Sequence, residues 1–358
     1  MVVDILTKRK SKGIKLLGLS CSELEQLLTN YGYPSYRGKQ IYKWLYHKGI
    51  KDLTEISDLP KSIREEFIKE GFSIGRLKLT SLAKSNDETL KLLLSTADDD
   101  YIETVGIPTE KRLTACLSSQ IGCSMDCKFC ATGKAGLKRS LYSNEIIDQI
   151  LSLQDVMKRN VSHVVFMGMG EPLLNMEQLL ISIRCINEDL GISQRRITVS
   201  TVGIPGLIQK LLLNSLEKLG KAQFTLAVSL HASNQTLREK IIPSAKNYPI
   251  KDLIKDCKEY VLISKRRISF EYLLIDDIND QKSHAYELAE LISGFQSHVN
   301  LIQYNPIEEA DFKRPTNNKV RLFSQYLLSK GIEVSIRRSR GLERNSACGQ
   351  LRSYSLSK

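Results

Sequence analysis

The chain has 358 residues, of which 42% are hydrophobic, and its 52 Lys and Arg against 40 Asp and Glu give a formal net charge of +12. This length predicts two or three domains at about 150 residues each, and the apolar content is enough for a large core. No apolar run reaches the roughly 18 residues of a membrane span, so we expect no membrane partner. Eight cysteines without a secretory signal at the N-terminus fit a reducing compartment, so we expect a cytoplasmic location.

The excess positive charge is concentrated at the two ends of the chain. Residues 1–50 carry nine Lys or Arg and three Asp or Glu, and residues 331–358 carry six and two. Charge placed in this way indicates a polyanionic partner, most simply a nucleic acid. The alternative is a basic surface that serves solubility alone.

The N-terminal part of the chain predicts a basic arm followed by a small all-helical domain. Residues 1–12 form the arm, and the helical domain covers residues 15–75. Its first helix is predicted to begin at Ser22, which forms a capping-box pattern with Glu25, and to end at Gly32. A basic helical domain can bind RNA phosphates; the alternative is a lid or a packing domain.

Two further helices complete this predicted domain. The second covers residues 36–49 and has one apolar stripe among basic side chains: Ile41, Trp44 and Leu45. The third starts after Pro60, a residue suited to the first turn of a helix. It is predicted to bury three apolar side chains: Ile63, Phe67 and Ile68.

Residues 76–112 predict a β-hairpin extension that links the helical domain to the rest of the chain. Runs of apolar and β-branched residues at 89–94 and 101–105 read as its two strands, with a turn at residues 98–100. A further strand is predicted at residues 112–118.

Strands and helices then alternate, and we assign residues 113–330 to an α/β domain followed by a C-terminal segment, residues 331–358. The predicted strands are 161–167, 196–200, 223–229, 268–274, 299–303 and 332–336, and the predicted helices are 143–156, 176–190, 205–219, 250–264, 283–295 and 318–330. Repeated βα units predict a parallel sheet, open or closed into a barrel. About six units fall short of the eight in a complete barrel, and functional side chains should lie at the C-terminal ends of the strands.

Three cysteines in one short loop are the strongest chemical signal in the sequence. Cys123, Cys127 and Cys130 have the spacing C-x3-C-x2-C and can converge on one metal centre. A structural zinc site needs a fourth ligand, and the nearest histidine, His163, lies beyond a predicted helix. An iron–sulfur cluster held by three cysteines instead leaves one iron open to another ligand. The alternative is three structural or incidental cysteines.

Polar residues follow four of the predicted strands. Glu171 comes after Gly168 and Gly170, which allow close backbone approach, and its carboxylate suits a cofactor amine. The other three strand ends carry Ser200, Ser229-Leu230-His231 and Asn305. Any one of these residues alone is more often a cap or turn residue. Because all four strand ends share one rim beside the cysteine loop, we predict a cofactor site there.

The remaining cysteines are ambiguous by context alone. Cys21, Cys185 and Cys257 lie on or beside predicted helices and are interpreted as small hydrophobic residues. Cys116, on the strand before the cysteine loop, and Cys348, near the C-terminus, receive the same interpretation from their neighbours.

Three motifs together resemble one known family. Residues 122–133 (GCSMDCKFCATG), 166–175 (FMGMGEPLLN) and 347–351 (ACGQL) are similar to those of the bacterial dual-specificity RNA methyltransferases, which are radical S-adenosylmethionine (SAM) enzymes. The similarity covers nearly the whole chain. It implies a partial (βα)6-type barrel with flanking strands and an N-terminal helical domain. It also implies methylation of carbon 2 of an adenosine in 23S rRNA, at the peptidyl-transferase centre, and of the adenosine 3′ to the anticodon in tRNA.

The resemblance implies a role for each candidate site residue. Cys123, Cys127 and Cys130 would ligate one 4Fe–4S cluster. The SAM-contacting residues would be Gly170, Glu171, Ser200, Ser229, Leu230, His231 and Asn305. Cys348 would be methylated during the reaction, and Cys116 would pair with it in a transient disulfide. Glu103 matches the proton acceptor, a role for which Cys116 is the alternative.

The implied reaction uses two molecules of SAM per turnover. The first methylates Cys348, and the second is cleaved to a 5′-deoxyadenosyl radical that takes a hydrogen from this methyl group. The carbon radical adds to carbon 2 of adenine, a base removes the ring proton, and Cys116 attacks the Cys348 sulfur to release the product. The two cysteines must therefore meet, with Cα atoms within about 7 Å.

The resemblance further implies a monomer that receives electrons from a donor such as flavodoxin with its reductase. Three other functions stay open. The first is methylation of carbon 8 of the same rRNA adenosine, and the second is a non-catalytic iron–sulfur or zinc protein that binds RNA. The third, a radical SAM enzyme acting on a small molecule, leaves the basic ends of the chain unexplained.

Overall fold

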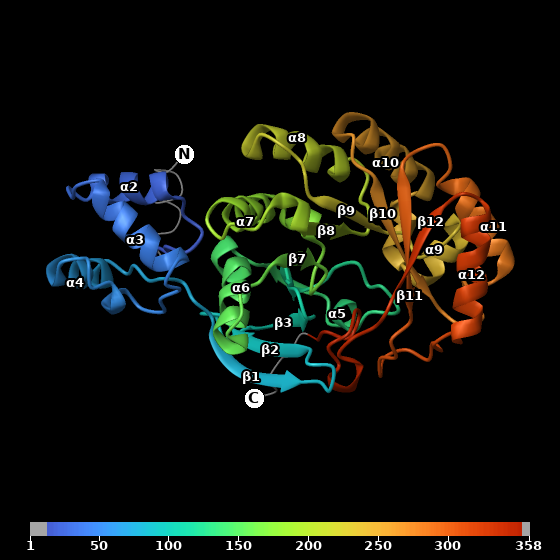
Figure 1. Ribbon diagram of the computed structural model, residues 1–358, viewed down its shortest axis with the longest axis horizontal. Helices are drawn as coiled ribbons and strands as arrows, with labels where there is room; N and C mark the ends of the chain where they lie inside the picture. The colour runs from blue at the N-terminus through green and yellow to red at the C-terminus, as the bar shows by residue number, and fades with distance from the viewer. Residues whose placement is uncertain (1–12, 353–358) are drawn as a thin grey trace.

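A curved sheet of ten strands, with helices along its outer side, forms most of the molecule (Figure 1). The computed structural model describes residues 13–352, so the arm predicted for residues 1–12 lies outside the described residues. A separate group of short helices at the N-terminal end lies beside this sheet (Figure 1). The α/β fold class and the helical N-terminal region are therefore confirmed. Within residues 13–352, no helix is long and apolar enough to cross a membrane.

The helical group has a hydrophobic core separate from the main one, and Ile147, Leu151 and Cys185 of the following α/β part pack into it. It contains α2 (Cys21–Asn30), α3 (Tyr36–Tyr46), a 3-10 turn η1 (Leu53–Glu55) and α4 (Lys61–Lys69). Leu24, Ile41 and Phe67 are among the side chains buried between these helices. Gly38 allows helix α3 to pack closely against helix α2, because a Cβ at this position would collide with the α2 backbone at Glu25. We call residues 14–74 the helical module.

Three local predictions in this module are wrong. The capping box of α2 is formed by Ser20 and Glu23 rather than by Ser22 and Glu25: the Glu23 amide donates to Ser20 Oγ over 3.2 Å, and the Ser20 amide donates to Glu23 Oε2 over 2.7 Å. The capping-box pattern Ser-x-x-Glu occurs twice around the start of α2, at Ser20 and at Ser22, and the structure uses the first. Helix α3 ends at Tyr46 instead of residue 49. Ile68 is 47% exposed, because the buried face of α4 runs through positions 63 and 67, one turn apart.

The large sheet combines an antiparallel part and a parallel part. Its strands are β1 (Lys78–Lys84), β2 (Leu90–Ser95), β3 (Tyr101–Pro108), β4 (Leu113–Cys116), β7 (His163–Phe166), β8 (Ile197–Thr201), β9 (Thr225–Ser229), β10 (Ile268–Leu274), β11 (Ser297–Gln303) and β12 (Glu333–Arg337). They pair in this order, antiparallel from β1 to β4 and parallel from β4 to β12. The predicted hairpin and βα strands are confirmed. The edge strand β1 was not predicted, because its mostly exposed side chains give no apolar alternation.

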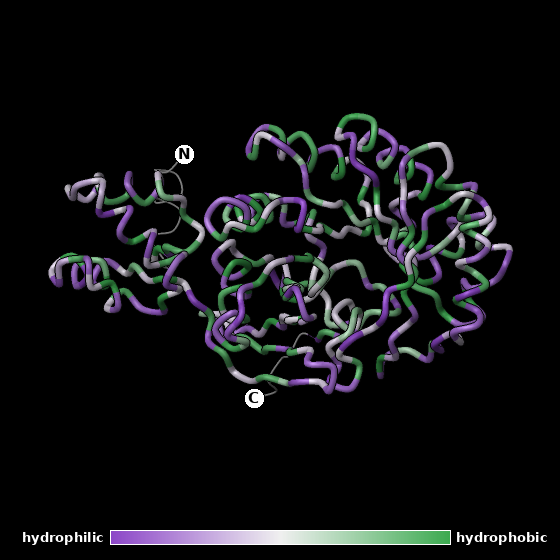
Figure 2. The backbone as a smooth tube through the Cα atoms, in the orientation of Figure 1, coloured by the Kyte–Doolittle hydropathy of each residue, from purple (hydrophilic) through white to green (hydrophobic). Residues whose placement is uncertain are grey.

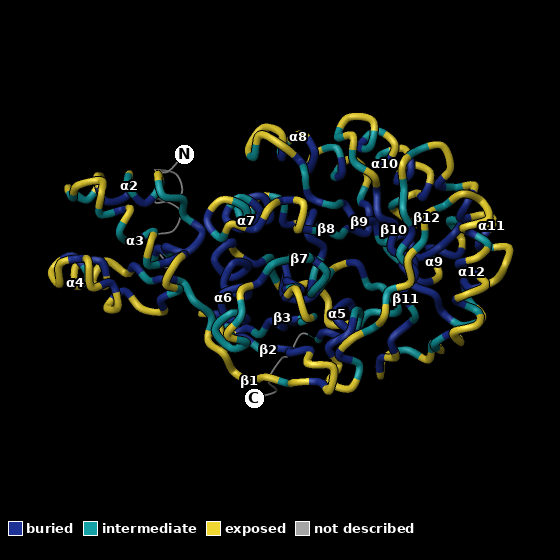
Figure 3. Tube along the Cα trace, viewed as in Figure 1, coloured by how far each residue is buried: buried dark blue, intermediate teal, exposed yellow. Residues whose placement is uncertain are grey.

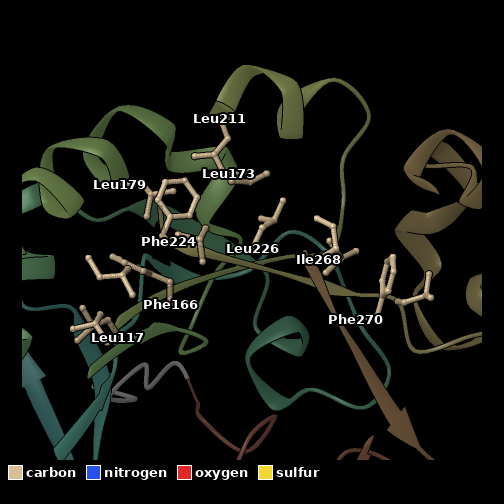
Figure 4. Packing of buried hydrophobic residues seen from close by; sticks show 14 of the residues in the cluster. Leu117, Phe166, Leu173, Leu179, Leu211, Phe224, Leu226, Ile268 and Phe270 are labelled. Carbon is tan, nitrogen blue, oxygen red and sulfur yellow. The ribbon is translucent and has the colours of Figure 1, made fainter. Parts of the chain in front are cut away.

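Helices cover the convex side of the parallel part. They are α6 (Ser143–Met157), α7 (Met176–Glu188), α8 (Leu207–Leu219), α9 (Gln235–Ile241), α10 (Ile250–Ser264), α11 (Lys282–Leu291) and α12 (Asn317–Ser329). Their inner faces and the sheet enclose the main core, which includes Phe166, Leu211, Phe224 and Phe270 (Figure 4). The strands are largely buried and the outer turns of the helices are exposed (Figure 3). Hydrophilic stretches accordingly alternate with hydrophobic ones along these helices (Figure 2). The short α9 was not predicted, because its seven residues hold only two apolar side chains, Leu237 and Ile241, which make a single helical period.

The concave side of the sheet is closed by the C-terminal part of the chain instead of by strand pairing. After β12, residues 338–352, which we call the closing segment, run back to the β2–β3 hairpin (Figure 1). Lys91 Nζ donates to the Asn345 carbonyl over 3.1 Å, and the Arg352 amide donates to Glu103 Oε2 over 2.8 Å. The Gly341 amide donates to Asp87 Oδ2 over 3.1 Å. Hydrogen bonds to side chains thus hold this segment in place.

A buried ion pair joins the helical module to the sheet. Arg76 Nε pairs with Asp148, whose side chain is fully buried on α6, and Arg76 Nη2 lies 2.8 Å from Asp155 Oδ2. Arg76 Nη1 also donates to the Gly49 carbonyl over 2.7 Å. One guanidinium therefore links the module to α6, and removing it would leave the Asp148 carboxylate buried without its cation.

We expect Arg76→Met to destabilise the protein by about 3–5 kcal/mol, because it leaves that carboxylate unpaired. Arg76→Met combined with Asp148→Asn should recover a large part of the loss, since the amide is neutral and can still accept the Leu77 amide bond. Chemical denaturation of the two variants and the parent measures both effects. A double variant less stable than Arg76→Met alone would contradict this account.

Candidate active site

The cysteine loop projects from a two-stranded hairpin, β5 (Gln120–Gly122) and β6 (Leu137–Ser140). Gly122 has φ +76° and packs so tightly on the Gly136 carbonyl that no side chain fits there. The Cys123 amide donates to the same carbonyl over 2.9 Å, which closes the base of the loop. The three thiols of Cys123, Cys127 and Cys130 all line one cavity, which we call the first cavity.

The spacing of these thiols distinguishes between the two kinds of metal centre that the sequence suggests. Among residues 13–352, only Asp276, Asp277 and Asp280 place three ligand atoms within 4.8 Å of one another, so at least one pair of the three cysteine sulfurs is further apart than 4.8 Å. A single zinc ion with Zn–S bonds of about 2.3 Å would need sulfur atoms about 3.8 Å apart. A larger iron–sulfur cluster, bound by thiolates, fits the wider arrangement. The three aspartates instead form ion pairs with Lys319, whose Nζ lies 2.6–3.3 Å from a carboxylate oxygen of each.

Burial keeps these thiols protonated when nothing is bound to them. It raises the pKa of Cys123 to about 12, and it raises the pKa values of Cys127 and Cys130 above that of an exposed thiol. Only the thiolate is a metal ligand, so binding of a cluster would release protons from this loop.

The wall beside the loop is built from the turn after β7. Gly170 has φ +100°, and a Cβ there would lie 2.5 Å from the Gln120 Cβ, so only glycine fits. The buried Glu171 follows and lines the first cavity. Its Oε1 accepts from the Leu173 amide over 3.0 Å and its Oε2 from the Val202 amide over 2.7 Å. Each oxygen has a second lone pair, so the fixed carboxylate can still accept from a ligand.

The next two strand ends add hydroxyl groups to the same cavity. Ser200 Oγ on β8 and Ser229 Oγ on β9 lie 3.5 Å apart, and both residues line the cavity. Leu230 does not line it, because its side chain is buried in the main core. Only the backbone of Leu230 is therefore available for the ligand contact expected from the sequence.

His231 presents one defined tautomer to the first cavity. Its Nδ1 accepts the Leu273 amide bond over 3.0 Å, so the neutral ring carries its proton on Nε2. Burial, together with Arg238, lowers the pKa of His231 to about 3, so the ring is neutral at physiological pH. The residue has φ +57°, a costly backbone conformation that Asn279 supports by donating to the His231 carbonyl over 2.8 Å.

Cys348 lies where two cavities meet. It lines the first cavity, and it also lines a second cavity together with Cys116 of β4. Its carbonyl accepts a 3.0 Å bond from Asn305 Nδ2, and the next carbonyl, of Gly349, accepts from the Ala131 amide over 2.8 Å. The structure thus brings together two cysteines that are distant in the chain, and places Cys348 beside the cysteine loop. Both are free thiols, and burial raises the pKa of Cys116 to about 12.

Glu103 lies outside both cavities. Its side chain is almost fully buried, with Oε1 at 2.7 Å from Lys91 Nζ and Oε2 accepting from the Arg352 amide over 2.8 Å. It lines neither the first cavity nor the second. In this structure Glu103 holds the closing segment.

Two charged residues of the site were not predicted from the sequence. Arg337 ends β12 and lines both cavities, and Glu271 of β10 lines the first with its Oε2 buried and without a hydrogen-bond partner. Arg337 carried a usable signal, since it directly follows the strand predicted at residues 332–336, and functional side chains are expected at the C-terminal ends of the strands. Glu271 carried a usable signal, since it is the only charged residue in the apolar strand ISFEYLL, and buried charges require a specific reason.

Comparisons with known proteins agree with this geometry. Residues 117–289 match the radical SAM superfamily, and residues 14–71 match the N-terminal domain of ribosomal RNA large subunit methyltransferases. The chain is 58% identical to a probable dual-specificity RNA methyltransferase RlmN of Synechococcus sp. (strain CC9902), over 94% of this chain and 96% of the relative. It is 59% identical to a protein of the same name from Prochlorococcus marinus (strain MIT 9515), over 94% and 97%. The crystal structure of a radical SAM methyltransferase from Sphaerobacter thermophilus superposes with a TM-score of 0.90 at 38% identity, over 95% of this chain and 99% of that one.

We expect the protein, reconstituted without air, to bind about four irons per chain in one 4Fe–4S cluster. Cys127→Ala should lose the characteristic absorbance and the EPR signal of the reduced cluster. Cys185→Ala, which removes a thiol of α7 that is buried against the helical module, is the matched control and should retain both. Full cluster loading of Cys127→Ala would show that the loop is not the ligand set.

Proposed function

The chain belongs to the family of dual-specificity RNA methyltransferases within the radical SAM superfamily, and on that premise we propose that it methylates carbon 2 of adenosine in 23S rRNA and in tRNA. It is an RNA methyltransferase by its family, and the proposal adds the position, the targets and the route. The targets are the rRNA adenosine of the peptidyl-transferase centre and the tRNA adenosine 3′ to the anticodon. The observation that carries the route is the position of Cys348 between the two cavities.

The residues of the first cavity fit the two groups that the family uses. Cys123, Cys127 and Cys130 would hold the cluster, and the SAM site would be formed by Gly170, Glu171, Ser200, Ser229, the Leu230 backbone, His231 and Asn305. When bound, the cluster and two molecules of SAM per turnover supply a methyl group and a hydrogen-abstracting radical. Apolar neighbours such as Phe129 and Leu273 exclude water from this side of the site.

Cys348 carries the transferred carbon in the proposed route. Carbon 2 of adenine lies between two ring nitrogens and is electron-poor, so it does not attack a methyl sulfonium. Cys348 therefore takes the methyl group on its sulfur first. This carbon then gives up one hydrogen atom to the radical that bound SAM would supply and joins carbon 2 of the base, and the adduct would give up its unpaired electron to the cluster. Cys116, as the thiolate, attacks the Cys348 sulfur and forms a disulfide. The bond between the Cys348 sulfur and the methylene carbon breaks, and this carbon keeps the electron pair and takes up a proton to become the new methyl group. Both cysteines line the second cavity, as this exchange requires.

The ring proton of carbon 2 must also be removed, and Glu103 and Cys116 are the two candidate acceptors. Neither is ready for this role in the present structure. Glu103 would have to leave Lys91 and the Arg352 amide to reach the second cavity. Cys116 is a thiol at neutral pH because burial raises its pKa to about 12, so it must lose a proton before it acts as base or nucleophile.

The helical module offers a surface for the RNA. On α3, Lys43 is exposed, Arg37 donates to the Asp58 carbonyl over 3.0 Å, and Lys39 Nζ lies 3.4 Å from Glu25. Lys48 Nζ lies 3.3 Å from the centre of the Trp44 ring. Cations beside an aromatic ring suit phosphates and unstacked bases. We further propose a cytoplasmic monomer that receives electrons from a flavodoxin-like donor.

We expect the reconstituted enzyme to convert the target adenosine of unmodified 23S rRNA fragments to 2-methyladenosine, identified by mass spectrometry of the nucleosides. Cys348→Ala should reduce methyl transfer to background, because no sulfur remains to carry the methyl group. Cys257→Ala, a buried cysteine of α10, is the control and should stay active. A product of 8-methyladenosine would establish the sister activity instead, and an active Cys348→Ala would exclude the proposed route.

We expect RNA binding to weaken steeply with salt, because neutralising phosphates releases counterions. Reversing the charge at Arg37, Lys39 and Lys43 together should lower the slope of log K against log salt by about 0.7–0.9 for each phosphate that is no longer neutralised. The same reversal at the exposed Lys251, Lys255 and Lys258 of α10 is the matched control. Equal slopes for both triple variants would mean that α3 does not bind the RNA.

A further inference from the structure

The second cavity is strongly cationic. Arg112, Arg337, Arg338 and Arg340 line it, and no Asp or Glu is found among its lining residues within the described chain. Its apolar walls are formed by Val105, Ile107, Met167, Ile302 and Leu351. Apolar side chains suit the faces of an extruded base, and cations at the edge suit its flanking phosphates. The composition fits a nucleotide better than it fits a neutral small molecule.

Arg337 differs from the other three arginines in its position. It is only partly exposed, whereas Arg112, Arg338 and Arg340 lie nearer the rim, where Arg112 and Arg340 are exposed. As the last residue of β12 it shares the inward face of that strand with Ser335, which hydrogen-bonds within the concave side of the sheet. It is also the only arginine that lines both cavities, as Cys348 does. Its guanidinium therefore lies close to the sulfur that would carry the methyl group.

The Arg337 guanidinium has more hydrogen-bond donors than it uses within the described chain. It has five N–H groups, and within residues 13–352 its one hydrogen-bond partner is the thioether of Met167, which Nη1 contacts over 3.3 Å. No carboxylate of the described chain lies within 4.0 Å of it, and the buried Glu271 of β10, which also lines the first cavity, acts on it electrostatically from a longer distance. A thioether is a weak acceptor. A cation placed in this way is prepared to bind a ligand that offers acceptor atoms.

The ligand of the second cavity offers such acceptors at the required place. Carbon 2 of adenine is flanked by the ring nitrogens N1 and N3, and both are hydrogen-bond acceptors. When carbon 2 faces Cys348, one of these nitrogens lies on the side of its neighbour Arg337. Building on the proposed function, we infer that Arg337 donates a hydrogen bond to a ring nitrogen next to carbon 2 and so holds the target adenine against Cys348.

Two consequences follow for the reaction. The bond fixes which edge of the base faces the sulfur, so Arg337 acts as a positioning and specificity residue. A cationic donor on the adjacent nitrogen also draws electron density away from carbon 2, which favours attack by an electron-rich carbon. Arg338 and Arg340 lie nearer the rim, where Arg340 Nη1 donates to the Pro108 carbonyl over 3.0 Å, and are suited to phosphates instead.

Equilibrium binding tests this interaction without relying on turnover. RNA fragments carrying adenosine, 1-deazaadenosine or 3-deazaadenosine at the target position are titrated with cluster-loaded enzyme without reductant. The parent enzyme should bind one of the two analogues at least tenfold more weakly, since a hydrogen bond to a charged group contributes about 1.5–3 kcal/mol. Arg337→Gln should bind adenosine RNA more weakly by a similar factor and should no longer distinguish that analogue.

Arg338→Gln is the matched control, because it removes the same charge one residue away. It should weaken binding of all three RNAs by one common factor, as removal of a phosphate-binding cation does. If Arg337→Gln distinguishes adenosine RNA from the deaza analogues as strongly as the parent does, the inference is overturned. Should Arg337→Gln fail to fold, the parent enzyme alone decides: equal affinity for all three RNAs also overturns it.

The two proposals fail in different ways. A parent enzyme that makes no 2-methyladenosine from the adenosine RNA refutes the proposed function. A parent that makes it while Arg337→Gln keeps full discrimination refutes only the role of Arg337. In the expected result, Arg337→Gln also loses methyl transfer to adenosine RNA at least tenfold, with part of the loss in KM.

Discussion

The position of Cys348 depends on the hydrogen bonds that hold the closing segment across the concave side of the sheet. Lys91 and Glu103 of the β2–β3 hairpin hold its Asn345 and Arg352, and the cysteine loop holds Gly349 through the Ala131 amide. These contacts come from the β2–β3 hairpin and from the cysteine loop, and both lie far from the closing segment in the sequence. Because they meet at one segment, a single sulfur can face both the cluster ligands and Cys116.

The same arrangement explains why the candidate active site is divided into the first and second cavities instead of forming one large cavity. The residues that line both, Met167, Ile302, Asn305, Arg337, Cys348 and Leu351, form the wall between them. On one side lie buried thiols, hydroxyls and a neutral histidine, which suit a cluster and a cofactor. On the other side lie apolar walls and arginines, which suit RNA. The first cavity, whose chemistry requires the exclusion of water, is thereby separated from the second cavity, whose RNA-binding surface must be accessible to solvent.

Much of the architecture could be predicted from the sequence, because the parallel strands are short apolar runs between amphipathic helices. Strand β10 agrees to the residue, and the strand ends at Glu171, Ser200 and Ser229 do line one cavity. The exposed edge strand β1 has no such pattern and was missed. The structural contacts of Glu103 were also out of reach, because its partners depend on how the closing segment packs, and this packing leaves no periodic trace in the sequence.

The closing segment contains no strand pairing along residues 338–352, and this has a consequence for motion. Its hydrogen bonds to Lys91, Asp87 and Glu103 involve side chains, so none belongs to a ladder between strands. If the closing segment detached, every strand of the sheet would therefore stay paired with its neighbours. The free energy of this local opening would be well below the free energy of global unfolding. A bulky polynucleotide could thus enter and leave, and the thiol could be uncovered for recycling, while the scaffold stayed intact.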